Sequence, residues 1–290
     1  MKIGSHAEQL LQAVGEPALS KPSKPLLSDF DWGSHGVSHA YLILMTGRCG
    51  STWLTSILRE TRLAGNPGEF FNAAVARRES DGAQGLQGYL GALASKETSN
   101  GRFGLEIDST RLRHIEALVD WRSVFPAAST ASFFLYRTNL LAQAWSWASA
   151  RKSGLWHVRT YAKVPTPTVS EALPTSAELI QEMVRIRRDE QYLGKFFDRY
   201  GYRPYYLDYE SLLTELDTEI RTILRILSVD LEKISSAQIT ADNKAVAKIQ
   251  YTEKSSALAA FADEHTQALT FLRQNRFQIS AEELSELFGS

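Results

Sequence analysis

The sequence predicts an α/β fold of three layers, in which helices flank a central, mostly parallel sheet. The first observation is the apolar run Tyr41–Met45, which suits a strand buried on both faces of a parallel sheet. The second is the short loop that follows, after which apolar residues recur at helical spacing from Thr52. The third is another strand-to-helix unit, in which Phe133–Tyr136 precedes a helix whose apolar stripe begins at Leu140. Strands that alternate with helices in this way are typical of α/β folds.

The length and composition suit one domain. The chain has 290 residues, of which 43% are apolar, and this is enough to bury a sizeable core. We expect an N-terminal extension over residues 1–39, where prolines interrupt a possible helix at Glu8–Val14, and a single domain over residues 40–290. Within that domain, residues 158–176 are rich in proline and threonine and are expected to form a loop insertion.

The charge pattern excludes several classes of partner. A formal net charge of -1 gives no general attraction to nucleic acids or acidic membranes. Because no apolar stretch approaches the roughly 20 residues of a spanning helix or resembles a signal peptide, we expect a cytoplasmic protein without stable membrane insertion. Cys49 is the only cysteine, and no Cys/His cluster has the spacing of metal ligands, so we expect no metal.

Hydrophobic periodicity predicts the remaining elements. Residues 102–108 alternate, with Phe103, Leu105 and Ile107 on one face, and this pattern predicts a strand. We also expect helices around Leu86–Leu93, over Leu112–Trp121, from Ser176 onward, over Glu219–Leu227 and over Glu282–Phe288, and a strand running into a turn over Tyr202–Leu213. The arginines at positions 185, 187 and 188 are expected to lie on a solvated face of the long helix.

The loop between the first strand and its helix is predicted to bind an anion. The first amides of a helix have no partners within it and direct their positive ends toward the loop. Gly47 and Gly50 allow the backbone to curl around a phosphate or sulfate, Arg48 adds charge, and Ser51 and Thr52 add hydroxyl donors. An ordinary N-capped turn is the alternative interpretation. For Cys49, a space-filling role is favoured over that of a nucleophile.

Carboxylates are predicted beside this loop. Glu69 follows a Pro/Gly turn, and one strand and one helix return the chain to the carboxyl edge of the sheet, where α/β proteins bind ligands. Glu69 could therefore face the anion site, with a helix-capping contact as the alternative. Glu106 and Asp108 share the polar face of their strand and could pair with an arginine or act as general bases.

A second anion-binding unit is predicted after the strand Phe133–Tyr136. Arg137 stands at the end of this strand, and Ser146 lies nine residues later, about two turns into the next helix. A guanidinium fork and a hydroxyl in these places could hold one phosphate from two sides. A strand-end arginine alone is more often an ion-pair partner, so the prediction depends on the first loop as well.

In combination, these motifs resemble a known family. They are Arg48-Cys49-Gly50-Ser51-Thr52-Trp53-Leu54, Gly65-Asn66-Pro67-Gly68-Glu69-Phe70-Phe71, Phe103-Gly104-Leu105, and Tyr136-Arg137 through Gln143-Ala144-Trp145-Ser146 to Ser153-Gly154-Leu155-Trp156-His157. In this order, over most of residues 41–230, they resemble the trehalose 2-sulfotransferase-like bacterial carbohydrate sulfotransferases. The resemblance implies the sulfotransferase fold, which is similar to that of P-loop NTPases.

The resemblance also implies a donor and roles for individual residues. The donor would be 3'-phosphoadenosine-5'-phosphosulfate, with no metal required. The implied donor-binding residues are Arg48, Cys49, Gly50, Ser51, Thr52, Trp53, Arg137 and Ser146. Among them, Arg48, Gly50, Ser51 and Thr52 would hold the 5' phosphosulfate, and Arg137 and Ser146 would hold the 3' phosphate. Glu69 would be the catalytic base, and Arg48 would stabilise the transition state. One departure is Glu106, since the family often carries a lysine there.

The acceptor and some of the donor contacts stay open in the sequence. Family likeness favours a hydroxyl of a carbohydrate or glycolipid, with another small-molecule alcohol as an alternative, and a homodimer is possible. Trp145, Trp147 and Trp156 could stack on a sugar or form core. Lys244, Lys248 and Lys254 are candidates for a further basic contact to the nucleotide. The rival functions are a P-loop phosphotransferase, although the Gly-Lys pair of the P-loop is missing, and a non-catalytic nucleotide-binding relative.

Overall fold

The centre of the fold is a parallel sheet with the strand order β2-β1-β3-β4. The computed structural model describes residues 24–72, 75–76, 85–154, 173–235, 239 and 254–289. Its strands are β1 (His39–Met45), β2 (Arg102–Asp108), β3 (Ala131–Tyr136) and β4 (Tyr205–Asp208). The α/β prediction and the predicted strands are confirmed, although β1 and β3 begin slightly earlier than expected.

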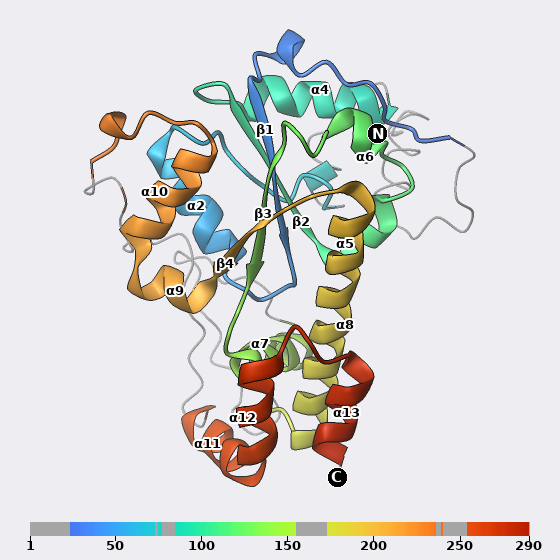
Figure 1. Cartoon of the computed structure of the whole chain (residues 1–290), viewed down its shortest axis with the longest axis vertical. Coiled ribbons are helices and arrows are strands. Elements are labelled where there is room, and N and C mark those ends of the chain that lie inside the picture. The colour runs from blue at the N-terminus through green and yellow to red at the C-terminus, as the bar shows by residue number, and fades with distance from the viewer. Residues whose placement is uncertain are drawn as a thin grey trace.

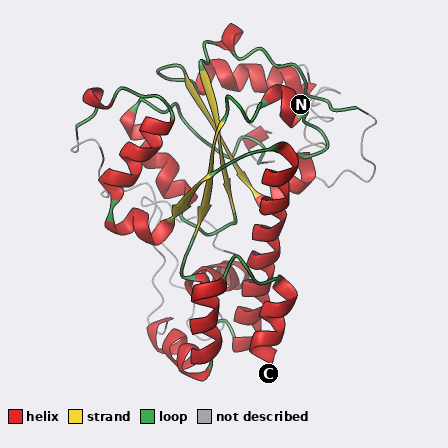
Figure 2. Ribbon diagram, viewed as in Figure 1, coloured by secondary structure: helices red, strands yellow, loops and turns green. Residues whose placement is uncertain are grey.

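Helices cover both faces of the sheet (Figures 1 and 2). On one face, α2 (Ser51–Thr61) and α10 (Leu216–Ile226) pack on the odd-numbered side chains of β1, such as Ile43. On the other face, α4 (Gly85–Glu97), α5 (Ser109–Ile115), α6 (Trp121–Val124) and the second half of α8 (Ser176–Tyr200) pack on Leu42 and Leu44. This separation follows from the two-residue period of a strand, which places neighbouring side chains on opposite faces.

A third apolar cluster lies beyond the carboxyl ends of the strands. It joins α7 (Leu140–Ser153) and the first half of α8 to the C-terminal helices α11 (Lys254–Glu264), α12 (Thr266–Asn275) and α13 (Ala281–Gly289). Figure 1 shows these helices below the sheet, at the edge to which the strands point. Ligands of α/β proteins bind at this edge, and the third cluster borders it.

The predicted helix over Leu112–Trp121 is divided in the structure. Asp108 caps α5 by accepting from the amides of Thr110 and Arg111, so α5 begins earlier than expected, and it ends at Ile115. Asp120 caps a separate short helix, α6, that begins at Trp121. Each of the two helices therefore begins at a capping aspartate, although the apolar pattern runs through both without a break.

The other elements agree with the predictions in outline. Within Tyr202–Leu213, only β4 is extended, and α9 (Tyr209–Thr214) follows it directly. The long helix α8 begins at Ser176 as expected, with a capping box between Thr175 and Glu178. The predicted helix Glu8–Val14 and most of the predicted insertion at 158–176 lie outside the described residues. Residues 24–38 pack on the domain through the buried side chains of Leu27, Phe30 and Val37.

The prediction of a solvated arginine cluster on α8 is wrong for two of its members. Arg187 is buried, where it pairs with Glu190 and donates to two carbonyl groups of the segment between α12 and α13. The guanidinium carbon of Arg185 lies 3.8 Å from the ring centroid of Trp147. Only Arg188 is exposed. The C-terminal helices, which cover this side of α8, are the reason for the difference.

Candidate active site

The loop between β1 and α2 has the backbone shape of an anion site. Arg48 (φ 65°) and Gly50 (φ 87°) both have left-handed conformations, and Gly50 occupies the N-cap position of α2. Among the described residues, no side chain caps this helix. The amide of Trp53 donates to the carbonyl oxygen of Gly50 at 3.1 Å, and the start of α2 faces the loop in which the sequence predicts a phosphate or sulfate site.

Two side chains of α7 hold the start of the loop. Gln143 and Trp147 both donate to the carbonyl oxygen of Gly47, each at 2.8 Å, and Gln143 also donates to the hydroxyl of Thr46 at 2.9 Å. The indole of Trp147 lies so close to Gly47 that an added Cβ atom would meet its ring at 2.3 Å. Close packing against α7 thus requires glycine at position 47. Sequence reasoning missed these two anchoring roles, because the contacts link residues about a hundred positions apart.

Arg48 and Ser146 lie together. Nε of Arg48 donates to the hydroxyl of Ser146 at 2.9 Å, so α7 contributes directly to the first anion loop. The resemblance grouped Ser146 with Arg137, whereas the structure brings it next to Arg48. Because the Ser146 oxygen accepts this bond, its own O–H is able to donate to a ligand.

Arg137 lies at the end of β3, next to α9. Both Nε and Nη2 donate to the same carboxylate oxygen of Glu210, at 3.2 and 3.1 Å. The guanidinium also stacks 4.6 Å from the ring centroid of Tyr209. The Tyr209 ring in turn lies against the loop, since a Cβ atom at Gly50 would meet it at 2.3 Å. Tyr209 therefore connects the two predicted anion-binding units, a role that the sequence did not indicate.

Two further predicted loop residues have different surroundings. The ring of Trp53 meets that of Tyr209 edge to face, with 6.0 Å between the centroids, and is partly exposed. The side chain of Cys49 is fully buried in the core below the loop, 3.8 Å from the sulfur of Met45, and burial raises the pKa of its thiol well above the ordinary value. A thiol that stays protonated is a poor nucleophile, so Cys49 can offer a ligand only its backbone.

Three carboxyl groups lie beside the loop at the end of β2. The pKa of Glu69 is raised, first by burial and then by the negative charge of Asp108, while a hydrogen bond from Asn72 and the charge of Arg111 lower it. The pKa of Glu106 is raised to about 8, mainly by burial and then by the charge of Glu69. Asp108 caps α5, with its Oδ1 2.8 and 2.9 Å from two amides, which gives it a structural role.

A buried arginine from the C-terminal part of the chain supports this edge of the sheet. Arg276 pairs with Glu190 of α8 and donates to the carbonyl oxygens of Arg137 and Thr138. It also donates weakly to the side-chain oxygen of Gln143, which holds the loop. The sequence prediction looked for a basic residue among the C-terminal lysines. Lys244, Lys248 and the side chain of Lys254 lie outside the described part of the chain, so their prediction is not tested, and among the described side chains Arg276 reaches the sheet edge.

The predicted aromatic residues separate into core and site. Trp145 is buried in the third apolar cluster, whereas Trp147 borders the loop, and Trp156 lies outside the described residues.

Within the part of the chain that the structure describes, no three His, Cys, Asp or Glu residues are placed to hold a metal ion. None of the described helices has both the length and the apolar character needed to cross a membrane.

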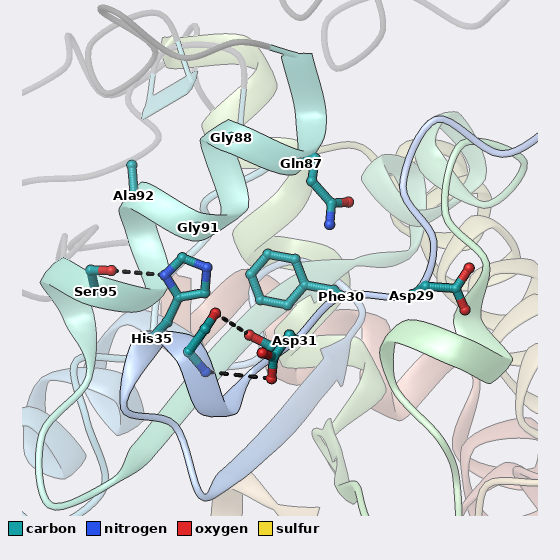
Figure 3. Close-up of a pocket in the computed structure, with 10 residues that line it drawn as sticks. Asp29, Phe30, Asp31, His35, Gln87, Gly88, Gly91, Ala92 and Ser95 are labelled. Atoms are coloured by element: carbon teal, nitrogen blue, oxygen red, sulfur yellow. Dashed lines mark hydrogen bonds between the residues drawn. The ribbon is translucent and has the colours of Figure 1, made fainter.

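A separate hollow of about 420 Å³ lies near the amino ends of β1 and β2, away from the loop. It is formed by the short 3-10 helix η1 (Gly33–His35), the residues before it, and α4 (Figure 3). Phe30 and His35 stack in parallel inside it, and His35 hydrogen-bonds with Ser95 at 3.0 Å. It contains none of the residues predicted to bind the donor or to act in catalysis.

A family-model comparison agrees with the predicted resemblance. The family model described as Stf0 sulphotransferase matches residues 40–104 and 110–251. Among solved structures, the sulfotransferase domain from the Synechococcus PCC 7002 olefin synthase is similar over 93% of this chain and 98% of that chain, with 14% identity and a TM-score of 0.37. No curated protein sequence matches the chain.

Proposed function

The chain belongs to the Stf0 sulphotransferase family, and from this premise we propose that it transfers the sulfuryl group of 3'-phosphoadenosine-5'-phosphosulfate to a hydroxyl of a carbohydrate, glycolipid or other small-molecule alcohol. The observation that carries the proposal is the uncapped start of α2, with Arg48 beside it and Glu69 at the neighbouring strand end. An anion site next to a carboxyl group of raised pKa has the two parts that sulfuryl transfer needs.

The donor would lie along the loop. The amides at the start of α2, together with Arg48 and the hydroxyls of Ser51 and Thr52, would hold the 5' phosphosulfate. Arg137 would hold the 3' phosphate by exchanging, wholly or in part, its contacts with Glu210. Ser146 accepts from Arg48 and can donate to either phosphate group.

The adenine ring of the donor requires an apolar surface. Trp53 and Tyr209 form an aromatic edge between the two anion-binding units, and flat aromatic surfaces of this kind stack with heterocyclic bases. The partial exposure of Trp53 leaves its ring accessible.

In the transfer step, the acceptor oxygen attacks sulfur in line with the phosphate that leaves. The new bond joins the acceptor oxygen to sulfur, and the bond from sulfur to the bridging phosphate oxygen breaks, which releases adenosine 3',5'-bisphosphate. Glu69 would take the proton of the acceptor hydroxyl, and its raised pKa makes it a stronger base than an ordinary carboxylate. Arg48 and the loop amides would stabilise the charge that grows on the leaving oxygen.

A thermal-shift measurement tests the donor site. We expect adenosine 3',5'-bisphosphate to stabilise the full chain. ATP with magnesium should stabilise it much less, because ATP lacks the 3' phosphate that Arg137 would bind. Preferential stabilisation by ATP with magnesium would support the phosphotransferase alternative and contradict the proposal.

A screen of acceptors with labelled donor tests the chemistry. Transfer of the label to a carbohydrate, glycolipid or other alcohol supports the proposal and identifies the acceptor class. Stabilisation by the bisphosphate without transfer to any acceptor would favour the non-catalytic alternative.

A further inference from the structure

Glu106 is a buried carboxyl group that the proposed reaction does not use. Its side chain extends from β2 toward the face that α2 covers, and the residue is 3% exposed. Among the described residues, nothing hydrogen-bonds with its Oε1, although that atom is fully buried. An ionised carboxylate with an unpartnered, buried oxygen is costly, so the neutral acid is the favoured form of this group.

The surroundings of Glu106 favour the neutral form further. From α2, the hydroxyls of Ser51 and Thr55 face its carboxyl and lower its pKa. The charged and titratable groups that face it are Glu69 from the segment after α2, Asp108 from its own strand, Tyr41 from β1 and Cys49 from the loop. Burial and the two acids prevail over the hydroxyls and raise the pKa of Glu106 to about 8.

Glu106 also joins the two functional segments of the site. Its backbone amide donates to the carbonyl oxygen of Gly68 at 3.0 Å, directly before Glu69. Its carboxyl meets Ser51, the first residue of α2. The residue thus lies between the anion loop and the proposed base, underneath both.

We propose that Glu106 is a positioning residue for the anion loop, which supports anion binding while its carboxyl is protonated and weakens it after the proton is lost. This inference rests on the donor site of the proposed function. A negative charge near the first turn of α2 repels a bound anion and offsets the attraction that the amides exert on it. Because linkage is reciprocal, a bound anion must increase the affinity of Glu106 for its proton.

Isothermal titration with adenosine 3',5'-bisphosphate at pH 7 and pH 9 tests the inference on the full chain. We expect the wild-type protein to bind several-fold more weakly at pH 9, up to the limit of about tenfold that applies when only the form protonated at a group with a pKa of about 8 binds. Glu106→Gln keeps the shape and neutrality of the protonated acid. We therefore expect it to bind as the wild type does at pH 7 and to lose most of the decrease at pH 9.

A matched control is Glu219→Gln. Glu219 also has a pKa raised by burial, but it lies on α10 and hydrogen-bonds with Tyr205, away from the loop. We expect this variant to keep the full pH dependence of the wild type. If it loses that dependence, or if Glu106→Gln retains it, the inference is overturned.

Proton uptake provides a second measurement that needs no variant. Titrations of the wild type at pH 8.5 in two buffers of different ionisation enthalpy report the protons taken up on binding. At this pH the phosphate groups of the ligand are fully ionised, so uptake must come from the protein. Binding without uptake overturns the role of Glu106 alone, whereas an absence of binding at every pH overturns the donor site itself.

Discussion

Arg48 holds its guanidinium toward Ser146 at the cost of a left-handed backbone. A φ of 65° is unfavourable for a residue with a side chain, by roughly 1 kcal/mol. The packing of the loop under Gln143 and Trp147 sustains this conformation. Backbone strain of this kind is concentrated at functional sites, which agrees with a role of Arg48 in the reaction.

We expect Arg48→Ala to reduce sulfate transfer by about a hundredfold or more, since the loss of one charged donor to the transition state has an effect of this size. The measurement is turnover with labelled donor. Arg188→Ala is the matched control, because Arg188 is an exposed arginine whose partner, Glu282, is exposed as well. Equal turnover of the two variants would exclude a catalytic role of Arg48.

Glu69 is the proposed base, and its environment sets the direction of the pH dependence. Burial and the charge of Asp108 raise its pKa, so the basic form is gained at a higher pH than for an ordinary carboxyl group. We expect turnover to rise as the pH passes through the raised pKa of Glu69. Glu69→Gln should retain binding of adenosine 3',5'-bisphosphate and lose turnover. Unchanged turnover would contradict the role of Glu69 as the base.

Glu106 also links pH to stability. Its pKa is about 8 in the folded protein, above the ordinary carboxyl value near 4.5, so the folded state holds the proton more tightly than the unfolded chain. The free energy of unfolding should therefore fall as the pH rises from about 5 to 8. Urea unfolding at these two pH values measures the effect, and Glu106→Gln should show a smaller fall. An equal fall in both proteins would show that other groups cause it.

The contact between the loop and α7 is the feature that matters at the level of elements. Both Gln143 and Trp147 anchor Gly47, and no space remains for a side chain at that position. The arrangement of the loop therefore depends on a helix that begins almost a hundred residues later.

We expect Gly47→Ala to weaken binding of adenosine 3',5'-bisphosphate by about tenfold or more, because the added methyl group must displace either the loop or the indole. Gly194→Ala is the control. Gly194 lies inside α8 with nothing within 4 Å of an added Cβ, so this change should stabilise the fold by about 0.5–1 kcal/mol and leave binding unchanged. Unaltered binding by Gly47→Ala would show that the loop tolerates displacement.

At the level of the whole molecule, the pair of Arg276 and Glu190 joins the C-terminal helices to the sheet. Arg276 is only 6% exposed and also donates to the carbonyl oxygens at the end of β3. The last part of the chain thereby supports the strand end from which Arg137 extends. Removal of the Arg276 side chain should therefore lower the stability of the fold and disturb the site around Arg137.

We expect Arg276→Met to lower the free energy of unfolding by about 3 kcal/mol, because it leaves the Glu190 carboxylate buried with Arg187 as its remaining partner. Urea unfolding provides the measurement. Arg188→Ala, which removes an exposed pair, should change stability by less than about 1 kcal/mol. Similar values for the two variants would mean that the buried pair contributes little.

The sequence by itself determined the α/β fold, the strand and helix that flank the anion loop, and the family. These features depend on local patterns: apolar period, glycine spacing and the order of short motifs. The bounds of the helices after β2 were missed, because a capping aspartate sets the start of each one, Asp108 for α5 and Asp120 for α6.

Only the tertiary structure decided what surrounds the site. It placed Ser146 next to Arg48, Tyr209 against Gly50, and Arg276 at the sheet edge. It also buried Glu106 below the loop. The physical reason is that these contacts join residues far apart in the sequence, and burial, which sets the charge state of a carboxyl group, exists only once the chain has packed.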